Sequence, residues 1–260
     1  MRDDGLSPVA GIHSVRVAIR SAAQAVAEVW LERERRDGRL AELAAKAKSA
    51  GIRIRQVTRA ELDRHAEGTN HQGALAWVRP GVARGEADLE ACLAGIAGPP
   101  LLLILDEVQD PHNLGACLRT ADAAGVHAVI APRDNAVGVT PVVVKVASGA
   151  ATTVPYLQVT NLARTIALLK ARGIWVMGTA GEADQDVFES DLAGPLALVM
   201  GGEGRGLRRL TRERCDSLVR LPMRGQVESL NVSVATGICL YEAVRQRAAL
   251  VAPSRQKNPT

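Results

Sequence analysis

Runs of apolar residues alternate with helical patterns through the C-terminal two thirds of the chain. The run Leu101–Leu105 is continuous, as expected for a parallel strand that is covered on both faces. Similar apolar runs predict further strands at 127–130, 173–177, 196–200 and 218–221. Helical patterns separate these runs, at 114–124, 141–150, 162–172, 210–215 and 232–247. The alternation predicts an α/β fold with a doubly wound parallel sheet.

The first eighty residues predict a smaller α/β unit. A helical pattern begins at Gly11 and ends near Glu28, and a capping box of Thr58 and Glu61 marks the start of another helix. The remaining pattern predicts strands at 29–31, 52–57 and 74–78, a helix at 39–50 and a turn at 69–73. Prolines and glycines then surround a short helix near 89–92. We therefore expect a domain over 1–80, a linker over 81–98, a domain over 99–250 and a disordered tail over 251–260.

The stretch 228–240 combines a polar start with a long apolar helix. Glu228, Ser229 and Asn231 are polar groups of the kind that cap a helix N-terminus. From Val232 to Leu240 the residues are apolar or small almost all the way round, so we expect a buried helix rather than an amphipathic one. A polar start on a buried helix suits the floor of a ligand site. An ordinary core helix with a good cap fits the same pattern.

Composition and charge narrow the class of partner. Hydrophobic residues make up 47% of the chain, which is a globular composition, and aromatic residues make up only 2%, which leaves little material for stacking on nucleic-acid bases. The net charge of +4 arises entirely before residue 80, while the rest of the chain is neutral. A weakly basic module attached to a neutral one is consistent with a nucleic-acid partner.

The four cysteines form no close pair along the chain, so neither a zinc knuckle nor a redox motif is indicated. Cys117 and Cys239 fall inside apolar helical patterns and are expected to be small core residues. The start of the chain leads into no apolar run of a signal peptide, and no apolar stretch reaches membrane length. We expect a cytoplasmic protein without a metal ion.

Three segments follow predicted strands and carry unusual residues, and ligands of open α/β sheets bind at the carboxyl ends of strands. In the first segment, 106–120, Asn113 is the expected N-cap. Arg119 lies off the buried stripe of the same helix, beside Asp122. A solvated pair of Arg119 with Asp122 and a functional arginine both fit this position.

The second segment, 200–207, has four glycines in six residues, which lets a backbone approach a ligand closely. Glu203 lies inside this loop and would repel a phosphate, so a ligand with a ribose or a positive centre fits better. A flexible turn with an exposed glutamate is the alternative. The third segment, 221–231, leads into the apolar helix. By themselves these residues indicate a small-ligand site on a parallel sheet.

Taken together, the three segments resemble the three motifs of the SpoU/TrmH branch of the SPOUT RNA methyltransferases. The motifs correspond to 113–119, to 199–204 and to 221–235, in the family's order. The segments Gly11-Ile12-His13 and His71-Gln72-Gly73 resemble the L30e-like substrate-binding domain that precedes many members. The resemblance covers roughly residues 5–247 and implies an L30e-like α/β domain followed by a SPOUT-type parallel sheet with a C-terminal trefoil knot, an exception to the rule against threading.

The resemblance also implies a homodimer that binds S-adenosylmethionine, and it assigns roles to the motif residues. Arg119 is expected to act on a ribose 2'-hydroxyl, with Glu203 orienting Arg119 or the substrate. Asn113, Ser229 and Asn231 are expected to hold the loops and the target nucleotide. The backbone around five residues is expected to contact the cofactor: Met200, Gly201, Leu221, Met223 and Leu230.

The expected chemistry suits these residue types. A ribose hydroxyl is a poor nucleophile until a group removes or polarises its proton. Arg119 can act as the base, although its high pKa opposes this, or it can stabilise the developing alkoxide as a fixed cation. Within the branch, the segments 110–113, 178–183 and 241–247 most resemble members that methylate a guanosine ribose of 23S rRNA. Methylation of tRNA ribose and a non-catalytic role in rRNA binding during ribosome assembly are the alternatives.

Overall fold

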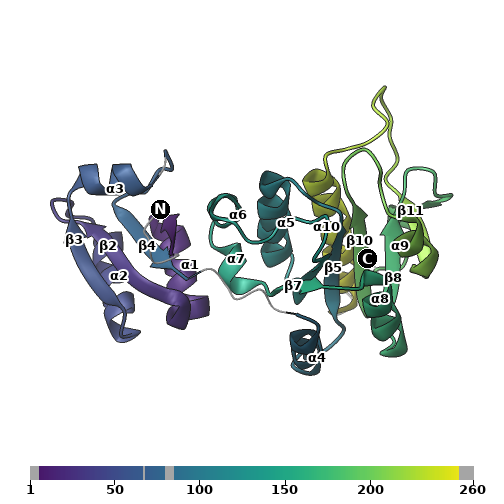
Figure 1. Ribbon diagram of the computed structural model, residues 1–260, viewed down its shortest axis with the longest axis horizontal. Coiled ribbons are helices and arrows are strands. Elements are labelled where there is room, and N and C mark those ends of the chain that lie inside the picture. Colours follow the sequence, from purple (N-terminus) through teal and green to yellow (C-terminus); the bar gives the residue numbers. More distant parts are fainter. Residues whose placement is uncertain (1–5, 67, 80–84, 252–260) are drawn as a thin grey trace, which may run out of the picture.

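The computed structural model describes residues 6–66, 68–79 and 85–251, which form two sheets of different size. Figure 1 shows the smaller sheet on the left and the larger one on the right. The smaller sheet has the strand order β1-β4-β2-β3, in which only the neighbours β2 and β3 are parallel. Its strands are β1 (Ser7–Ala10), β2 (Val26–Glu32), β3 (Arg53–Val57) and β4 (Ala74–Val78). Its helices are α1 (Ile12–Ala22), α2 (Gly38–Ser49) and α3 (Arg59–His65), with the 3-10 turn η1 (Ala23–Ala25) after α1.

Two predictions for this N-terminal unit were wrong in detail. The helix that was expected to reach Glu28 ends at Ala22, because β2 lies between β3 and β4 and pairs with both. Strand β1 was not predicted, since it has four residues, includes Pro8 and lies at the sheet edge, where proline is tolerated. The capping box at the start of α3 is confirmed by hydrogen bonds in both directions between Thr58 and Glu61.

The larger sheet confirms the predicted doubly wound parallel arrangement. Its strand order is β7-β6-β5-β10-β8-β11-β9, and each described neighbouring pair is parallel. Strands β7 and β9 were not predicted, since they have only four and two residues and show no apolar run. The strands are β5 (Leu101–Asp106), β6 (Ala128–Pro132), β7 (Tyr156–Val159), β8 (Trp175–Thr179), β9 (Gln185–Asp186), β10 (Leu196–Gly201) and β11 (Ser217–Arg220).

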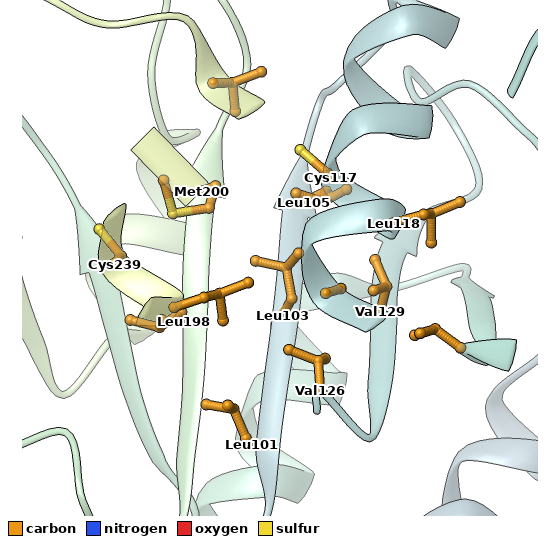
Figure 2. Close-up of a cluster of buried hydrophobic side chains, with 14 of the residues drawn as sticks. Leu101, Leu103, Leu105, Cys117, Leu118, Val126, Val129, Leu198, Met200 and Cys239 are labelled. Atoms are coloured by element: carbon orange, nitrogen blue, oxygen red, sulfur yellow. The ribbon is translucent and has the colours of Figure 1, made fainter. Parts of the chain in front are cut away.

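Helices cover both faces of this sheet, which explains the continuous apolar strands. The helices are α4 (Glu86–Ala94), α5 (Pro111–Ala123), α6 (Pro141–Ala147), α7 (Ala150–Thr153), α8 (Leu162–Ala171), α9 (Arg209–Arg214) and α10 (Val232–Val251), with the 3-10 turn η2 (Val187–Glu189). Leu101, Leu103 and Leu105 of β5 pack towards α5, as Figure 2 shows. Leu102 and Ile104 point to the other face and pack against a cluster that includes α8. No helix among the described residues is long and apolar enough to cross a membrane.

Helix α4 lies inside the segment that was expected to be a linker, yet it packs against the larger sheet. Leu89 is only 2% exposed and belongs to the same buried cluster as Leu102 and Leu157. The Glu86 carboxylate accepts hydrogen bonds from the backbone N–H and the hydroxyl of Thr160, at 3.1 and 2.7 Å. A fragment intended to preserve the C-terminal sheet should therefore begin before Glu86 rather than near Pro99.

Helix α10 is not buried all round, contrary to the sequence expectation. Cys239 and Leu240 are fully buried, whereas Val234 and Tyr241 are each 51% exposed. Val234 and Tyr241 are seven residues apart, which places them on one side of the helix. The helix therefore has an apolar face that the described residues of the chain leave uncovered.

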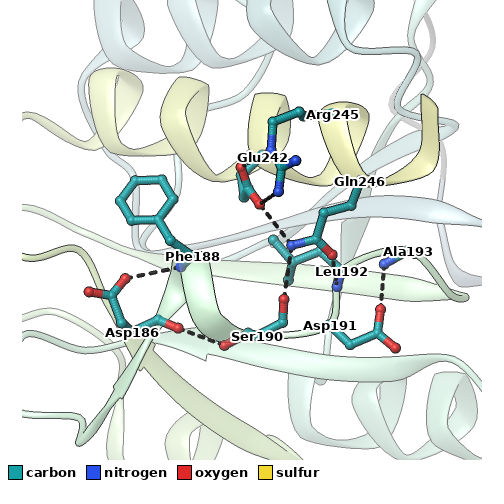
Figure 3. Close-up of polar contacts among 9 residues, drawn as sticks. All are labelled: Asp186, Phe188, Ser190, Asp191, Leu192, Ala193, Glu242, Arg245 and Gln246. Carbon is teal, nitrogen blue, oxygen red and sulfur yellow. Dashed lines mark hydrogen bonds and ion pairs between the residues drawn. The ribbon is translucent and has the colours of Figure 1, made fainter. Parts of the chain in front are cut away.

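The C-terminal half of α10 is fastened to the segment 186–193 (Figure 3). The Gln246 side chain accepts a hydrogen bond from the Leu192 N–H at 2.8 Å and donates one to the Ser190 carbonyl at 2.9 Å. Glu242 accepts from Gln246 and from the Arg245 guanidinium, and the Arg245 hydrogen bond lowers the pKa of Glu242 to about 2.

Replacing Gln246 with alanine should lower the free energy of unfolding by about 1–3 kcal/mol. The change leaves the Leu192 N–H and the Ser190 carbonyl without their partner, and an unsatisfied backbone group is costly. Urea unfolding measures the loss. Gln185→Ala is the matched control, since Gln185 is exposed on β9, and it should stay within about 0.5 kcal/mol of the parent. Equal stability of the two variants would contradict the assignment.

Candidate active site

The loops that follow β5, β10 and β11 meet at the carboxyl edge of the larger sheet, where the sequence predicted a ligand site. An open cavity of about 500 Å³ lies at this edge, between the loops after β5 and β10 and the first residue of α10. Carboxylates are prominent in its lining, and the N-terminus of α10 closes one side. The lining residues are Glu107, Val108, Gln109, Asp110, Asn113, Gly202, Glu203, Arg205, Gly206 and Val232.

Three of the predicted site residues, one from each motif, form a single hydrogen-bonded network. The Asn113 side-chain amide donates to Glu203 Oε1 at 2.7 Å. The Asn231 side-chain amide donates to the same Glu203 oxygen at 3.0 Å and to Asn113 Oδ1 at 2.9 Å. Glu203 and Asn231 lie 90 and 118 positions after Asn113 in the chain, so only the fold brings the three residues together. We call Asn113, Glu203 and Asn231 the polar triad.

Asn113 does not cap its helix, so its side chain is available to the polar triad, whereas Asn231 both caps its helix and belongs to the triad. The expected N-cap role of Asn113 was wrong, because Asp110 caps α5 and accepts the His112 N–H at 3.0 Å. Asn113 lies inside the first turn and is only 7% exposed. Asn231, by contrast, is a cap as predicted, since its Oδ1 accepts the N–H and hydroxyl of Ser233 at 2.9 and 2.6 Å.

Two glycines allow the loop after β10 to fold back on its own strand. A Cβ on Gly201 would lie 2.2 Å from the carbonyl carbon of Gly206. A Cβ on Gly202 would lie 2.5 Å from the Glu107 carbonyl oxygen. Gly202 and Gly206 form an antiparallel bridge, so the loop is a closed hoop with Glu203 and Arg205 on its exposed side. The hoop is therefore a defined structure and not only a flexible turn.

A buried ion pair anchors this hoop, and sequence reasoning missed it. Asp106 is fully buried at the end of β5 and pairs in register with Gly201. Its carboxylate accepts the Arg208 backbone N–H at 3.0 Å and the Arg208 Nε and second guanidinium nitrogen at 2.7 Å each. An aspartate that ends a buried apolar strand needs such a partner, and this was the signal available in the sequence.

Arg119 does not join the polar triad in the single chain. It is exposed and lies six positions after Asn113 on α5, which is about 9 Å along the helix axis. Among the described residues, the Arg119 side chain has no hydrogen-bond or ion-pair partner. The pair with Asp122 is absent, because Asp122 instead accepts a hydrogen bond from the Thr153 hydroxyl.

The residues that were predicted to contact a cofactor lie on the same edge but differ in exposure. Met200 is buried in the core, so only its backbone can face a ligand. Leu221 and Met223 are half-buried after β11, whereas Leu230 and Ser229 are exposed. In the part of the chain that the structure describes, the Ser229 side chain forms no hydrogen bond with the polar triad.

The cavity fits a cationic cofactor better than a phosphate. Glu107, Asp110 and Glu203 line it together with a single arginine, Arg205. S-adenosylmethionine carries a sulfonium and an ammonium group, which acidic linings attract. No group of three or more histidine, cysteine or acidic side chains suitable for a metal occurs among the described residues. Burial raises the pKa of Cys117, next to the triad on α5, to about 11, which keeps this thiol protonated and inert.

Comparisons with known proteins agree with this geometry. The model of the SpoU rRNA methylase family matches residues 100–241, and a model described as RNA 2'-O ribose methyltransferase substrate binding matches residues 8–81. The chain is 55% identical over 247 residues to the 23S rRNA (guanosine-2'-O-)-methyltransferase RlmB of Ralstonia nicotianae, covering 93% of this chain and 96% of that protein. It is 56% identical to the RlmB of Shewanella oneidensis, with coverages of 91% and 96%.

A solved structure is similar over nearly the whole chain. The SpoU methyltransferase AviRb from Streptomyces viridochromogenes, in complex with the cofactor AdoMet, superimposes with a TM-score of 0.74 at 26% identity. The match covers 94% of this chain and 91% of that one, so it includes both sheets. The chain therefore belongs to the SpoU rRNA methylase family.

Proposed function

We propose that this protein transfers the methyl group of S-adenosylmethionine to the ribose 2'-hydroxyl of a guanosine in 23S rRNA. The observation that carries the proposal is the polar triad, which joins the three motif segments beside a cavity of suitable charge. The high identity to the two RlmB proteins over most of the chain supports the choice of guanosine and 23S rRNA. A role on 23S rRNA, as in the two RlmB relatives, supports the proposal that the protein acts in the cytoplasm.

S-adenosylmethionine supplies an electrophilic methyl group, so the protein has to position and activate the ribose hydroxyl. Glu203 Oε1 is occupied by the two asparagine amides, which leaves Oε2 to accept a hydrogen bond from substrate or from Arg119. Asn113 and Asn231 hold the Glu203 hoop against α5 and α10. Arg119 removes the hydroxyl proton or stabilises the alkoxide as a fixed cation. Backbone groups near Gly201, Leu221, Met223 and Leu230 hold the cofactor, and Ser229 contacts the nucleotide.

Methyl transfer from labelled S-adenosylmethionine tests the proposal. Transcripts of 23S rRNA and a tRNA pool are incubated with the purified protein, and calorimetry measures cofactor binding in parallel. We expect label in 23S rRNA and none in tRNA. Label in tRNA alone would make the protein a tRNA ribose methyltransferase, and cofactor binding without transfer to any RNA would make it a binding protein.

We also propose a homodimer formed through the uncovered face of α10. Val234 and Tyr241 are large apolar side chains exposed on one side of this helix. An apolar patch with a polar rim is typical of a protein–protein interface. The triad and the cavity lie next to the N-terminus of α10, so a second copy docked on α10 would lie close to the site. The C-terminal trefoil knot, which the family resemblance implies, also stays a prediction.

The double variant Val234→Asp with Tyr241→Asp should convert the dimer to a monomer. Both side chains are half exposed in the single chain, so the fold should persist while two buried charges oppose the interface. Sedimentation at micromolar concentration should give twice the 27.5 kDa chain mass for the parent and the single mass for the variant. Val227→Asp, in the exposed loop before α10, is the control and should remain dimeric. A monomeric parent protein would refute the proposal.

A further inference from the structure

The two sheets are joined by a shared apolar contact. Val144 of α6 is 4% exposed and belongs to the buried cluster of the N-terminal unit, together with Val9 and Val15. Val139 and Ala151 of the C-terminal unit pack against the same cluster. A helix of the larger unit thus completes the core of the smaller one.

The backbone of the larger unit is shaped to receive α1. The helix that was predicted over 141–150 breaks at Ser148 and Gly149, which both adopt left-handed conformations with φ of 52° and 99°. A Cβ on Gly149 would lie 3.3 Å from Val17 Cγ1 and 3.4 Å from the Ser14 carbonyl oxygen. Both the positive φ and the close approach of α1 favour glycine here. The helix of the larger unit is therefore interrupted at the position where α1 packs against it.

This contact places the loop edges of both units on one side of the molecule, the upper side in Figure 1. Three segments of the smaller unit lie at this edge. The segment 33–37 follows β2, the start of α3 follows β3, and the turn 69–73 precedes the antiparallel strand β4. In the larger unit, the loops 107–110, 133–140 and 202–206 lie at the carboxyl edge that holds the cavity. A small cavity at the junction is lined by Ser14 and Thr69 from one unit and by Pro141 and Lys145 from the other.

Exposed arginines mark this face in both units. Arg36 lies in the loop after β2, Arg133 in the loop after β6 and Arg205 in the hoop beside the cavity. None of the three guanidinium groups has a hydrogen-bond or ion-pair partner among the residues that the structure describes. Arg35 and Arg39 differ, because both form ion pairs with the Asp37 carboxylate. Free guanidinium groups at several points of one face suit the phosphates of a nucleic acid, and the scarcity of aromatic residues argues against base stacking.

We propose that one RNA segment binds both units at once, along a face that runs from Arg36 past Arg133 to Arg205, and that the contact of Val17 with Gly149 fixes the spacing of this face. The inference rests on the proposed function and adds where and how the RNA lies. A fixed spacing raises the effective concentration of the target nucleotide at the cavity once the smaller unit has bound. The face therefore works as one site only while the units are docked.

Val17→Asp tests the contact from the side of α1, without changing the backbone of the larger unit. We expect the KM for 23S rRNA to rise by about tenfold or more, because the second binding event loses its effective concentration. Cofactor affinity should be unchanged, and the radius of gyration from solution scattering should increase. Gly149→Val tests the same contact from the other side. Val142→Asp, on an exposed position of α6, is the control and should match the parent in all three measurements.

A double-mutant cycle tests whether one RNA segment spans both units. Arg36→Ala and Arg133→Ala should each weaken RNA binding and reduce the dependence of log Kd on log salt by about one unit. Lys48→Ala removes an exposed charge from the opposite end of α2 and should change neither quantity. In the Val17→Asp background, Arg36→Ala should no longer change the KM for methylation.

The outcomes separate this inference from the function on which it rests. A parent protein that methylates no rRNA would refute the proposed function. A parent protein that methylates 23S rRNA while both contact variants keep its KM would overturn the inference alone. An unchanged radius of gyration in both variants would overturn it too, since the contact would then not hold the units together. Equal effects of Arg36→Ala with and without Val17→Asp would show that the two units bind RNA independently.

Discussion

Replacing Arg119 with alanine should lower single-turnover methylation of 23S rRNA by about 10²–10⁴-fold, the contribution expected of a general base or a fixed cation. The free energy of unfolding should change by no more than about 0.5 kcal/mol, because the side chain is exposed and has no partner in the described chain. Cofactor affinity should barely move, since loop backbones carry that contact. Arg119→Lys should also be poor, because lysine lacks the planar fork of the guanidinium.

Arg214→Ala, an exposed change on α9, is the matched control for Arg119 and should keep parental turnover. Near-normal turnover of Arg119→Ala would remove Arg119 from the mechanism. Arg119 would then be a solvated surface residue, since Asp122 accepts its hydrogen bond from Thr153 instead.

The position of Arg119 suggests that it serves the site of the other subunit in the proposed dimer. Arg119 is exposed six positions beyond Asn113 on α5 and has no hydrogen bond to the polar triad of its own chain, whereas α10, which packs against α5, has the uncovered face. Mixing Arg119→Ala with Glu203→Ala protein tests this. If Arg119 acts across the interface, mixed dimers hold one intact site, and equal mixing restores about a quarter of the parental activity. If it acts within its own chain, no activity returns.

Replacing Glu203 with alanine should lower turnover by about 10²–10³-fold, as expected when a preorganised group of an active site is lost. The change removes the acceptor that Asn113 and Asn231 share, so the hoop is no longer held against α5 and α10. Stability should change little, because the Glu203 side chain is exposed in the loop. Single-turnover methylation measures the first effect, and urea unfolding the second.

Two further variants show what Glu203 contributes. Glu203→Gln keeps a carbonyl oxygen for both asparagine amides but loses the charge, so it should fall between the parent and the alanine variant. Glu213→Ala removes an exposed carboxylate on α9 and should be silent in turnover. Parental turnover of Glu203→Ala would show that the polar triad is only structural.

The sequence was most informative where a residue's surroundings follow from its neighbours along the chain. Continuous apolar runs located β5, β6 and β10, because strands that are covered on both faces have few polar positions. Shorter apolar runs located β8 and β11, each of which has an exposed end. The motif resemblance selected Asn113, Glu203 and Asn231, and the structure brings these three together. The polar start of α10 was correctly interpreted as a cap, since Asn231 bonds its own helix.

The sequence was least informative where distant contacts decide the outcome. Asp110 rather than Asn113 caps α5, because Glu203, 90 positions away, holds Asn113. The break at Gly149 depends on the approach of α1, and the burial of Leu89 depends on a sheet that begins later in the chain. The Asp106–Arg208 pair spans 102 positions and has no local pattern. The places of Arg119 and Ser229 in the site, the dimer and the knot stay predictions.

The central claim is that this polar triad serves 2'-O-methylation of a guanosine in 23S rRNA. It is tested most directly by nuclease digestion and mass spectrometry of 23S rRNA after reaction with S-adenosylmethionine, for the parent protein and for Glu203→Ala side by side. The account predicts one 2'-O-methylguanosine at a single position with the parent, and its near absence with the variant at equal cofactor binding. A methyl group on a base, on another nucleoside or at equal yield in both proteins would contradict it.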